Sequence, residues 1–227
     1  LLDVIPLSLG LETMGGLVSK LIHRNSTIPA SATEQFTTAV DGQRNVLIHV
    51  LQGERELVKD CRSLARFDLK DLPPMPAGLA RIEVRFLIDA NGILNVTARD
   101  ARTGKEHSVE VKPSYGLSDE QVEAMIVESF AQAEADFHER QVREARVEAD
   151  SMLAAIEKAR RDAAYRELTA AEQAAIDTSI QELLTVYHAD DHLAIREKIE
   201  QLNASTLLLA ENMMNTAVRG ALKGTKI

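Results

Sequence analysis

Residues 81–98 read RIEVRFLIDANGILNVTA, and this stretch shows how the first half of the 227-residue chain folds. Apolar and polar residues alternate from Ile82 to Ile88, which is the period of a strand with one buried face. The pair Asn91-Gly92 favours a tight hairpin turn, because the central residues of that turn need a positive φ. The alternation resumes at Leu94. The stretch therefore predicts two antiparallel strands joined by a short turn.

The region before it carries similar signals, with one difference. Asp41-Gly42 is a turn signal between residues 36–39 and the run NVLIHVL at residues 45–51, and Thr103-Gly104 marks a further turn. About eight short strands with such turns and no helices between them predict an antiparallel β-sandwich. The strand at residues 46–51 is apolar on both faces. Either another layer covers it, or it offers an apolar surface to a partner.

Glycine, proline and charge divide the chain near residue 116. All six prolines and nine of the eleven glycines lie at or before Gly116, and residues 117–219 contain neither of these helix breakers. The first 116 residues carry 14 basic and 14 acidic residues, whereas the rest carries 12 and 21, so the whole net charge of −9 belongs to the second half. We therefore predict a β-sandwich domain over residues 1–116 and a helical domain over residues 117–227.

The second half begins with a strong helix signal. Ser118, with Gln121 three residues later, forms a capping box, and apolar residues including Phe130 and Phe137 then recur at helical spacing. Nine of the seventeen residues at 134–150 are charged, which is typical of a solvated helix that bridges two packed regions. One helix over residues 119–163 would be ~65 Å long, so we expect it to overhang the sandwich, to break, or both.

The remaining helices are expected to form a small bundle. Thr169 and Glu172 form a second capping box, and Asp190 is predicted to cap the next helix. His188 and His192 have the spacing of one helix face, but a cap between them means that they straddle a junction. We therefore do not expect them to bind a metal ion.

Several classes of function lack sequence support. The sequence has no apolar run of ~20 residues, the length that a transmembrane helix needs. It also has no Gly-x4-Gly-Lys-Ser/Thr phosphate loop and no Gly-x-Ser-x-Gly elbow. The single cysteine, Cys61, excludes an internal disulfide and is interpreted as a structural thiol. An acidic chain with eight aromatic residues does not favour nucleic-acid binding. We expect no catalytic residue and no metal site.

The opening stretch LDVIPLSLGLETMGG at residues 2–16 resembles the start of the substrate-binding domain of the seventy-kilodalton heat-shock chaperone family, to which DnaK belongs. The match continues through NSTIP at 25–29, IHVLQGER at 48–55 and DANGIL at 89–94, and it covers essentially the whole chain. The stretches at residues 56–67, 111–117 and 221–224 resemble the HscA-type branch, which serves bacterial iron–sulfur cluster assembly.

The resemblance implies that the sandwich binds an extended peptide in a channel between loops and that the helices form a lid. Side chains would line a central pocket, two residues would arch over the peptide, and backbone groups would bond to it. The implied pocket residues are Leu11, Phe36, Val46 and Ile48, the arch residues are Met14 and Ala39, and the backbone groups are those of Thr13, Met14, Thr37 and Ala39. Gln43 and Ile82 complete the implied peptide-binding set.

The resemblance also implies contacts outside the channel. Asp41 and Asp150 match acids that join lid and sandwich, but Ala77 and Ala154 replace their Arg and His partners, so a looser lid is expected. An N-terminal ATPase domain would precede Leu1 and would hold ATP and Mg, leaving no cofactor and no enzymatic activity in this chain. The positions implied in coupling to that domain are Leu1, Leu2, Asp3, Arg24 and Pro29.

The implied partners follow from the HscA-type branch. They are the iron–sulfur scaffold protein IscU, through a Leu-Pro-Pro-Val-Lys segment, and the J-domain co-chaperone HscB, in the bacterial cytoplasm. No membrane or nucleic-acid partner is expected. Two alternatives stay open: a DnaK-type domain with broad unfolded clients, and a non-catalytic adaptor that uses the helical bundle.

Overall fold

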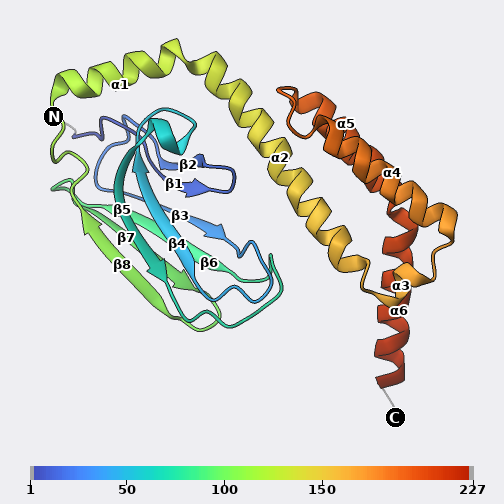
Figure 1. Ribbon diagram of the computed structural model, residues 1–227. Helices are drawn as coiled ribbons and strands as arrows, with labels where there is room; N and C mark the ends of the chain where they lie inside the picture. The colour runs from blue at the N-terminus through green and yellow to red at the C-terminus, as the bar shows by residue number, and fades with distance from the viewer. Residues whose placement is uncertain (1–2, 225–227) are drawn as a thin grey trace. The chain divides into compact units, whose positions relative to one another are not determined.

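The computed structural model describes residues 3–224 of the chain (Figure 1), so Leu1 and Leu2 lie outside the described residues. Within that range, eight β-strands come first and six α-helices follow. This order confirms the predicted fold class, an antiparallel sandwich followed by helices. The chain divides into two compact units, the first ending at Phe137 and the second beginning at His138. Strands give way to helices between Val111 and Asp119.

The strands form two antiparallel four-stranded sheets in the described part of the chain. The first sheet has the order β2-β1-β4-β5, and the second has the order β3-β6-β7-β8. The members of the first sheet are β1 (Leu9–Thr13), β2 (Leu17–Ile22), β4 (Val46–Gln52) and β5 (Arg62–Leu69). The members of the second sheet are β3 (Ala30–Phe36), β6 (Ile82–Ile88), β7 (Leu94–Asp100) and β8 (Glu106–Val111).

The hairpin predicted at residues 81–98 is confirmed. Strands β6 and β7 pair antiparallel, with Ile88 opposite Leu94, and Gly92 in the turn has a φ of 76°. The Asp89 carboxylate accepts hydrogen bonds from the backbone N–H of Ile93 and Asn91, at 2.9 and 2.8 Å. The bond from Ile93 is the main reason that the pKa of Asp89 lies below its usual value.

The turn at Asp41-Gly42 does not join two partners of a hairpin. Strand β3 pairs with β6, whereas β4 pairs with β1 and β5, so the chain passes from one sheet to the other between Phe36 and Val46. A turn signal fixes the local backbone, but it does not determine the strand with which each flanking segment pairs. The core then fills the space between the sheets, with Val50, Val84, Phe86 and Val96 fully buried.

The predicted long helix breaks at Gln132. Helix α1 (Asp119–Ala131) begins at the predicted capping box, in which Ser118 N–H donates to Gln121 Oε1 at 2.9 Å. Helix α2 (Ala133–Ala159) follows after a single turn residue. All 13 residues of α1 are half-buried or exposed, and Phe130 and Phe137 are 65% and 62% exposed. The apolar residues of this segment therefore do not form a buried stripe.

The second unit is a small helical bundle, as predicted. Its elements after α2 are α3 (Ala163–Arg166), α4 (Ala170–Val186), α5 (His192–Ser205) and α6 (Leu207–Gly224). Buried side chains of α4 and α5, among them Leu183 and Ile195, pack in one cluster with Ala145 and Ala149 of α2. Arg146 donates to the carbonyl oxygens of Tyr187 and Ala189 at 3.0 and 3.2 Å, just beyond the end of α4. Among residues 3–224, no helix is both long and apolar enough to cross a membrane.

The caps of the bundle agree with the sequence at one helix and differ at another. The capping box of Thr169 and Glu172 is confirmed at α4. The predicted cap of α5 at Asp190 is wrong, because Asp191 accepts the N–H groups of Leu193 and Ala194 at 3.0 and 3.1 Å. Asp191 has the extended backbone of an N-cap, whereas Asp190 lies one residue earlier and contacts His138 Nε2 at 3.0 Å. His188 and His192 straddle the α4–α5 junction, as expected.

This cap assignment predicts unequal effects for two adjacent substitutions. Asp191→Ala removes the acceptor of two helix N–H groups and should lower the free energy of unfolding by about 0.5–2 kcal/mol. Asp190→Ala removes one exposed contact and should cost no more than about 1 kcal/mol. Urea unfolding followed by circular dichroism at 222 nm measures both. A larger cost for Asp190→Ala than for Asp191→Ala would contradict the assignment.

Candidate functional site

One end of the sandwich collects most of the predicted peptide-binding residues. Thr13 ends β1 and Val46 begins β4, two neighbouring antiparallel strands. Phe36 ends β3 and lies opposite Ile82, the first residue of β6. The segments that connect these strand ends are hydrogen-bonded to each other, through Gly42 N–H to Met75 O at 2.8 Å and Gly78 N–H to Thr38 O at 3.0 Å.

The floor of this site is apolar and packed. Leu11, Ile48 and Ile82 are 3%, 4% and 0% exposed and belong to the sandwich core. Phe36 and Val46 are half-buried and pack against the same cluster. The structure thus brings together the four residues expected to line the pocket, and Ile82 with them. Their burial is graded, so that only Phe36 and Val46 keep partly open surface.

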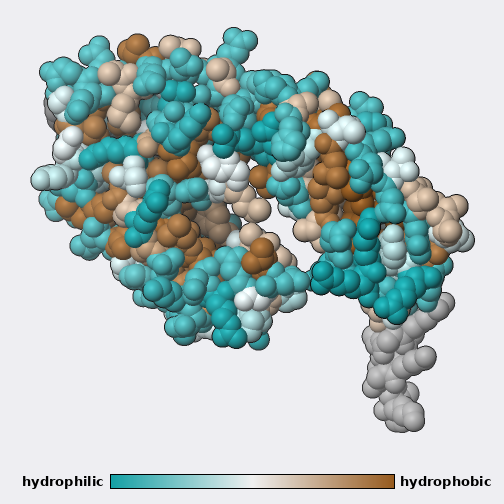
Figure 2. Space-filling view, viewed as in Figure 1, coloured by the Kyte–Doolittle hydropathy of each residue, from teal (hydrophilic) through white to brown (hydrophobic). Residues whose placement is uncertain are grey.

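Apolar side chains also stand open on the connecting segments. Met14, predicted as an arch residue, is 54% exposed, and Val40 and Leu79 are 60% and 61% exposed. Figure 2 shows apolar surface, in brown, on the part of the molecule built from strands. Exposed apolar residues of this kind are unusual on a free surface when they lie close together, and they mark binding sites. Val40 and Leu79 were not singled out from the sequence, although each lies beside a residue pair or a glycine that is typical of turns, Asp41-Gly42 after Val40 and Gly78 before Leu79.

The predicted polar residues of the site have defined roles in this structure. Gln43 Oε1 accepts the backbone N–H of Ala39 at 2.9 Å, and Gln43 Nε2 donates to Asn45 O at 2.8 Å. The N–H of Ala39, expected to bond a peptide, therefore serves the loop itself. Thr37 is exposed, and Thr13 Oγ1 donates to Leu17 O at 3.4 Å.

The two faces of β4 have different surroundings. Val46, Ile48 and Val50 face the sandwich core, whereas Leu47 on the other face is 56% exposed. Farther along this outer face, Leu51 is 1% exposed, and the segment after β4 runs beside β2, with Val58 N–H bonded to Gly16 O at 3.0 Å. Another layer thus covers one end of the outer face, and the other end stays open.

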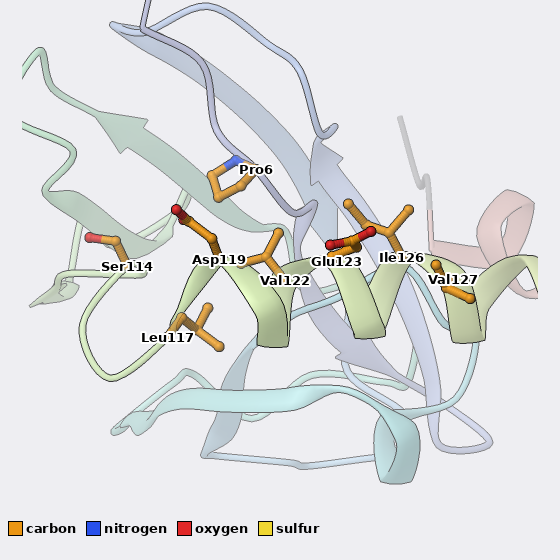
Figure 3. A pocket seen from close by; sticks show the side chains of 8 residues that line it. All are labelled: Pro6, Ser114, Leu117, Asp119, Val122, Glu123, Ile126 and Val127. Atoms are coloured by element: carbon orange, nitrogen blue, oxygen red, sulfur yellow. The ribbon is translucent and has the colours of Figure 1, made fainter.

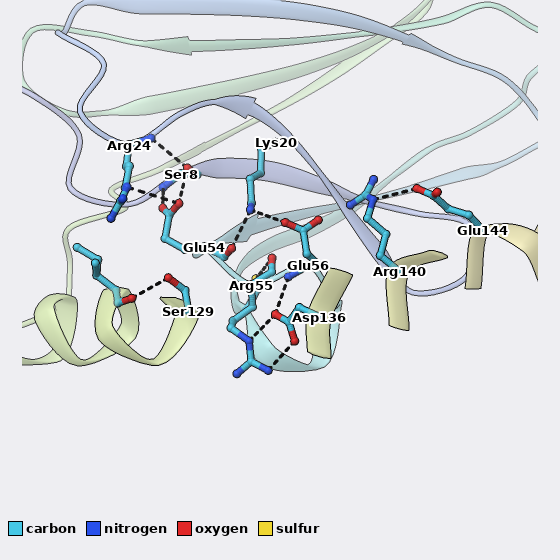
Figure 4. Close-up of polar contacts among 12 residues, drawn as sticks. Ser8, Lys20, Arg24, Glu54, Arg55, Glu56, Ser129, Asp136, Arg140 and Glu144 are labelled. Carbon is cyan, nitrogen blue, oxygen red and sulfur yellow. Dashed lines mark hydrogen bonds and ion pairs between the residues drawn. The ribbon is translucent and has the colours of Figure 1, made fainter. Parts of the chain in front are cut away.

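The segment after β4 also holds the start of the helices. Arg55 donates from Nε and Nη2 to the Asp136 carboxylate at 2.6 and 2.8 Å (Figure 4). It also donates from Nη1 to Glu128 at 2.9 Å. Asp136 is 5% exposed and also accepts the backbone N–H of Glu56 at 3.3 Å. The hydrogen bonds from Arg55 are the main cause of the lowered pKa of Asp136, and they raise the pKa of Arg55.

The predicted coupling residues that the structure describes, Asp3, Arg24 and Pro29, lie away from the end of the sandwich that holds Phe36 and Val46. Arg24 donates its backbone N–H to Ser8 Oγ at 3.0 Å (Figure 4). Its guanidinium lies over the ring of Phe130, 5.1 Å from the ring centre. Asp3 accepts the N–H of Ile28 at its carbonyl, 3.0 Å away, and Pro29 is exposed.

The predicted lid-contact acids each have a partner within their own unit. Asp41 accepts the backbone N–H of Ala77 at 2.8 Å, and Asp150 accepts the Tyr187 hydroxyl at 2.8 Å. Among the residues that the structure describes, no group of three or more His, Cys, Asp or Glu side chains is placed to hold a metal ion.

A groove that the sequence did not indicate lies along α1. It has a volume of about 330 Å³ and is lined by Pro6, Ser114 and Leu117 on one side and by Val122, Ile126 and Val127 of α1 on the other (Figure 3). The only trace of this groove in the sequence is the helical spacing of apolar residues in α1. That spacing does not show whether the apolar face of the helix is buried or open.

Comparisons with known proteins agree with this arrangement. A family model described as Hsp70 protein matches residues 1–215. The chain is 50% identical over 227 residues to a chaperone protein HscA homolog of Cupriavidus taiwanensis and 51% identical over 228 residues to one of Ralstonia pickettii. It is also 51% identical over 228 residues to chaperone protein HscA of Photorhabdus laumondii. Each match covers 100% of this chain but only 36–37% of the relative.

The Arg55–Asp136 pair predicts a local loss when it is broken. Arg55→Ala leaves the buried carboxylate of Asp136 without its charged partner and should cost roughly 1.5–3 kcal/mol. Amide hydrogen exchange over residues 119–137 should then quicken by about tenfold or more. Arg140→Ala is the control, because it lies outside residues 119–137 and its i,i+4 pair with Glu144 on α2 is partly exposed and worth about 0.5 kcal/mol or less. Equal exchange in the two variants would contradict the role of Arg55.

The same pair predicts a pH dependence. Because the folded-state pKa of Asp136 is lowered, its contribution to stability is complete above the usual Asp pKa and is lost as the pH falls through the lowered value. The amide NMR shifts of α1 should therefore stay constant from neutral pH down to about pH 4 and change only below it. Asp136→Asn should abolish that transition. A transition well above pH 4, or one that persists in Asp136→Asn, would contradict the assignment.

Proposed function

Because the chain belongs to the Hsp70 protein family, we propose that it is the client-binding part of an HscA-type chaperone and that its sandwich holds an extended peptide segment. The observation that carries this proposal is the placement of Phe36, Val46 and Ile82 at strand ends on one end of the two sheets, where they pack in the same core as Leu11 and Ile48. A chaperone domain needs an apolar site that is open to another chain, and Phe36 and Val46 supply partly open apolar surface there.

The chemistry of the site favours an extended apolar segment over a compact ligand. Edge backbone groups bond an added strand, and an apolar pocket selects one of its side chains. We propose Leu-Pro-Pro-Val-Lys of the scaffold IscU as that segment, because proline and the residue before it favour extended backbone. The helical part is proposed to act as the lid.

The chain spans about 36% of the length of the relatives that it matches. ATP and Mg binding, the ATPase reaction and coupling through Asp3, Arg24 and Pro29 are therefore proposed for the whole protein, with HscB as co-chaperone and the bacterial cytoplasm as location. We propose that this chain itself binds its client without catalysis and without a cofactor or metal ion.

A domain with broad unfolded clients is the second candidate. Ala39 favours it, because a small and exposed residue at an arch position leaves room for varied client side chains. The two candidates place the client in the same channel and differ only in the range of segments bound.

Two adjacent substitutions test the channel directly. Val46→Phe should fill the pocket and weaken binding of a fluorescein-labelled Leu-Pro-Pro-Val-Lys peptide by about tenfold or more, since it removes the space for one apolar side chain. Leu47→Phe adds similar bulk on the opposite, exposed face of β4 and should leave the affinity unchanged. Fluorescence anisotropy measures both, and circular dichroism confirms that each variant is folded.

The outcomes separate the candidates. Tight binding of Leu-Pro-Pro-Val-Lys but not of an unrelated leucine-rich peptide supports the HscA-type function. Equal binding of both peptides supports the domain with broad clients. Binding that ignores Val46→Phe contradicts the channel, and absence of binding by the unmodified chain contradicts the proposed function itself.

A further inference from the structure

We propose that His49 is a positioning residue for the peptide site: acting through Glu12, it fixes the end of β1 from which Thr13 and Met14 extend. The proposal rests on the proposed function, because it concerns the same site. His49 was not among the candidate site residues that the sequence indicated, and its side-chain hydrogen-bond partners are Glu12 and Ser63.

His49 links three neighbouring strands on the outer face of the first sheet. Its side chain points away from the core cluster that contains Ile48 and Val50, yet it is only 2% exposed. Nδ1 lies 2.6 Å from Glu12 Oε2 on β1, and Nε2 lies 2.8 Å from Ser63 Oγ on β5. Both ring nitrogens are therefore engaged, one on each side of β4.

A β-bulge brings Ser63 to the correct face. Val50 lies opposite Ala65 and Leu51 lies opposite Ser63, so the register skips Leu64. A bulge of this kind re-aims the side chains that follow it.

The hydrogen-bonding capacity of the two partners fixes the direction of the bonds. A carboxylate only accepts, so Nδ1 carries a proton and donates it to Glu12. The Ser63 hydroxyl can donate to Nε2 or accept from it, so it satisfies the neutral and the charged ring alike. The link to Glu12 is thus present in both charge states of His49.

This link extends the connection between β1 and β4 toward the site. The backbone pairing of β1 with β4 runs from Leu9 opposite Gln52 to Leu11 opposite Val50. Glu12 is the next residue on β1. Its side chain bonds to His49 on β4, so a side-chain contact joins the two strands one residue beyond the last backbone pair. Thr13 and Met14 follow at once. The bond therefore sets the position of these two residues relative to Ile48 and Val46 on β4.

Removing the bond should loosen that end of β1 without emptying the pocket. The apolar floor stays in place because Leu11 and Ile48 are held by the core. Thr13 and Met14 gain freedom, so a peptide bound beneath them should leave faster. We expect the rate of peptide dissociation to rise while the rate of association changes little, since the pocket that receives the peptide is unaltered.

Two amide substitutions of His49 separate positioning from simple structural support. Asn places its amide near Nδ1 and can still donate to Glu12, whereas Gln places its amide near Nε2 and reaches Ser63 instead. His49→Asn should keep the dissociation rate of labelled peptide within about threefold of the unmodified chain, and His49→Gln should raise it roughly tenfold. Stopped-flow fluorescence measures the rates, and urea unfolding measures the stability of each variant.

A second pair of substitutions, at the more exposed Glu12, keeps the inference testable if the variants of the buried His49 do not fold. Glu12→Gln keeps an oxygen that accepts from Nδ1 and should preserve slow dissociation, whereas Glu12→Ala should raise the rate roughly tenfold. Equal rates in His49→Asn and His49→Gln, together with equal rates in Glu12→Gln and Glu12→Ala, would overturn the inference. So would rates that follow the loss of stability alone.

Different results would contradict the proposed function and the role of His49. If the unmodified chain binds no peptide, the proposed function fails. If it binds peptide and loses that binding in Val46→Phe, but both pairs of variants dissociate alike, only the role of His49 fails.

Discussion

A single buried carboxylate, that of Asp136, holds the start of the helices on the sandwich, because Arg55 neutralises its charge with two hydrogen bonds. Apolar burial alone does not hold helix α1 in place, because every residue of α1 is half-buried or exposed. A buried carboxylate that loses its charged partner costs several kcal/mol. The position of Asp136 therefore depends on Arg55. Within the first unit, helix α1 and the first residues of α2 are therefore held by a directed ionic contact rather than by a buried apolar stripe.

Strand β4 and the segment that follows it connect all the functional parts of the first unit. Val46 and Ile48 supply the site floor, His49 on the opposite face reaches Glu12, and Arg55, three residues past the end of the strand, reaches Asp136. Successive side chains of a strand point to opposite faces of the sheet, so neighbouring residues of β4 contact different partners. The sequence left two explanations open for the apolar outer face of this strand. A covering layer accounts for Leu51, which is 1% exposed, whereas Leu47 is 56% exposed.

Features that depend on residues close in sequence were predictable, and those that depend on distant ones were not. The hairpin at residues 81–98 and the capping boxes of α1 and α4 need only neighbours within a few positions. The Arg55–Asp136 pair joins residues 81 positions apart, and no local pattern marks it. The cap of α5 shows the limit even nearby, because two adjacent aspartates offered the same signal and the structure places Asp191, not Asp190, at the N-cap.

For the candidate site, too, some features could be predicted and others could not. Its residues were proposed from a family resemblance, and the structure brings its apolar members together; the engagement of the Ala39 N–H by Gln43 depends on loop geometry that the sequence does not state.

The central claim is that an extended client lies against the apolar end of the sandwich. Isotope-filtered NOE measurements on the methyl-labelled chain with unlabelled Leu-Pro-Pro-Val-Lys peptide test it most directly. We expect NOEs from the peptide side chains to the methyl groups of Val46 and Met14, which keep open surface at this end. NOEs confined to the α1 groove at Val122 and Ile126, or to the helical bundle, would contradict it.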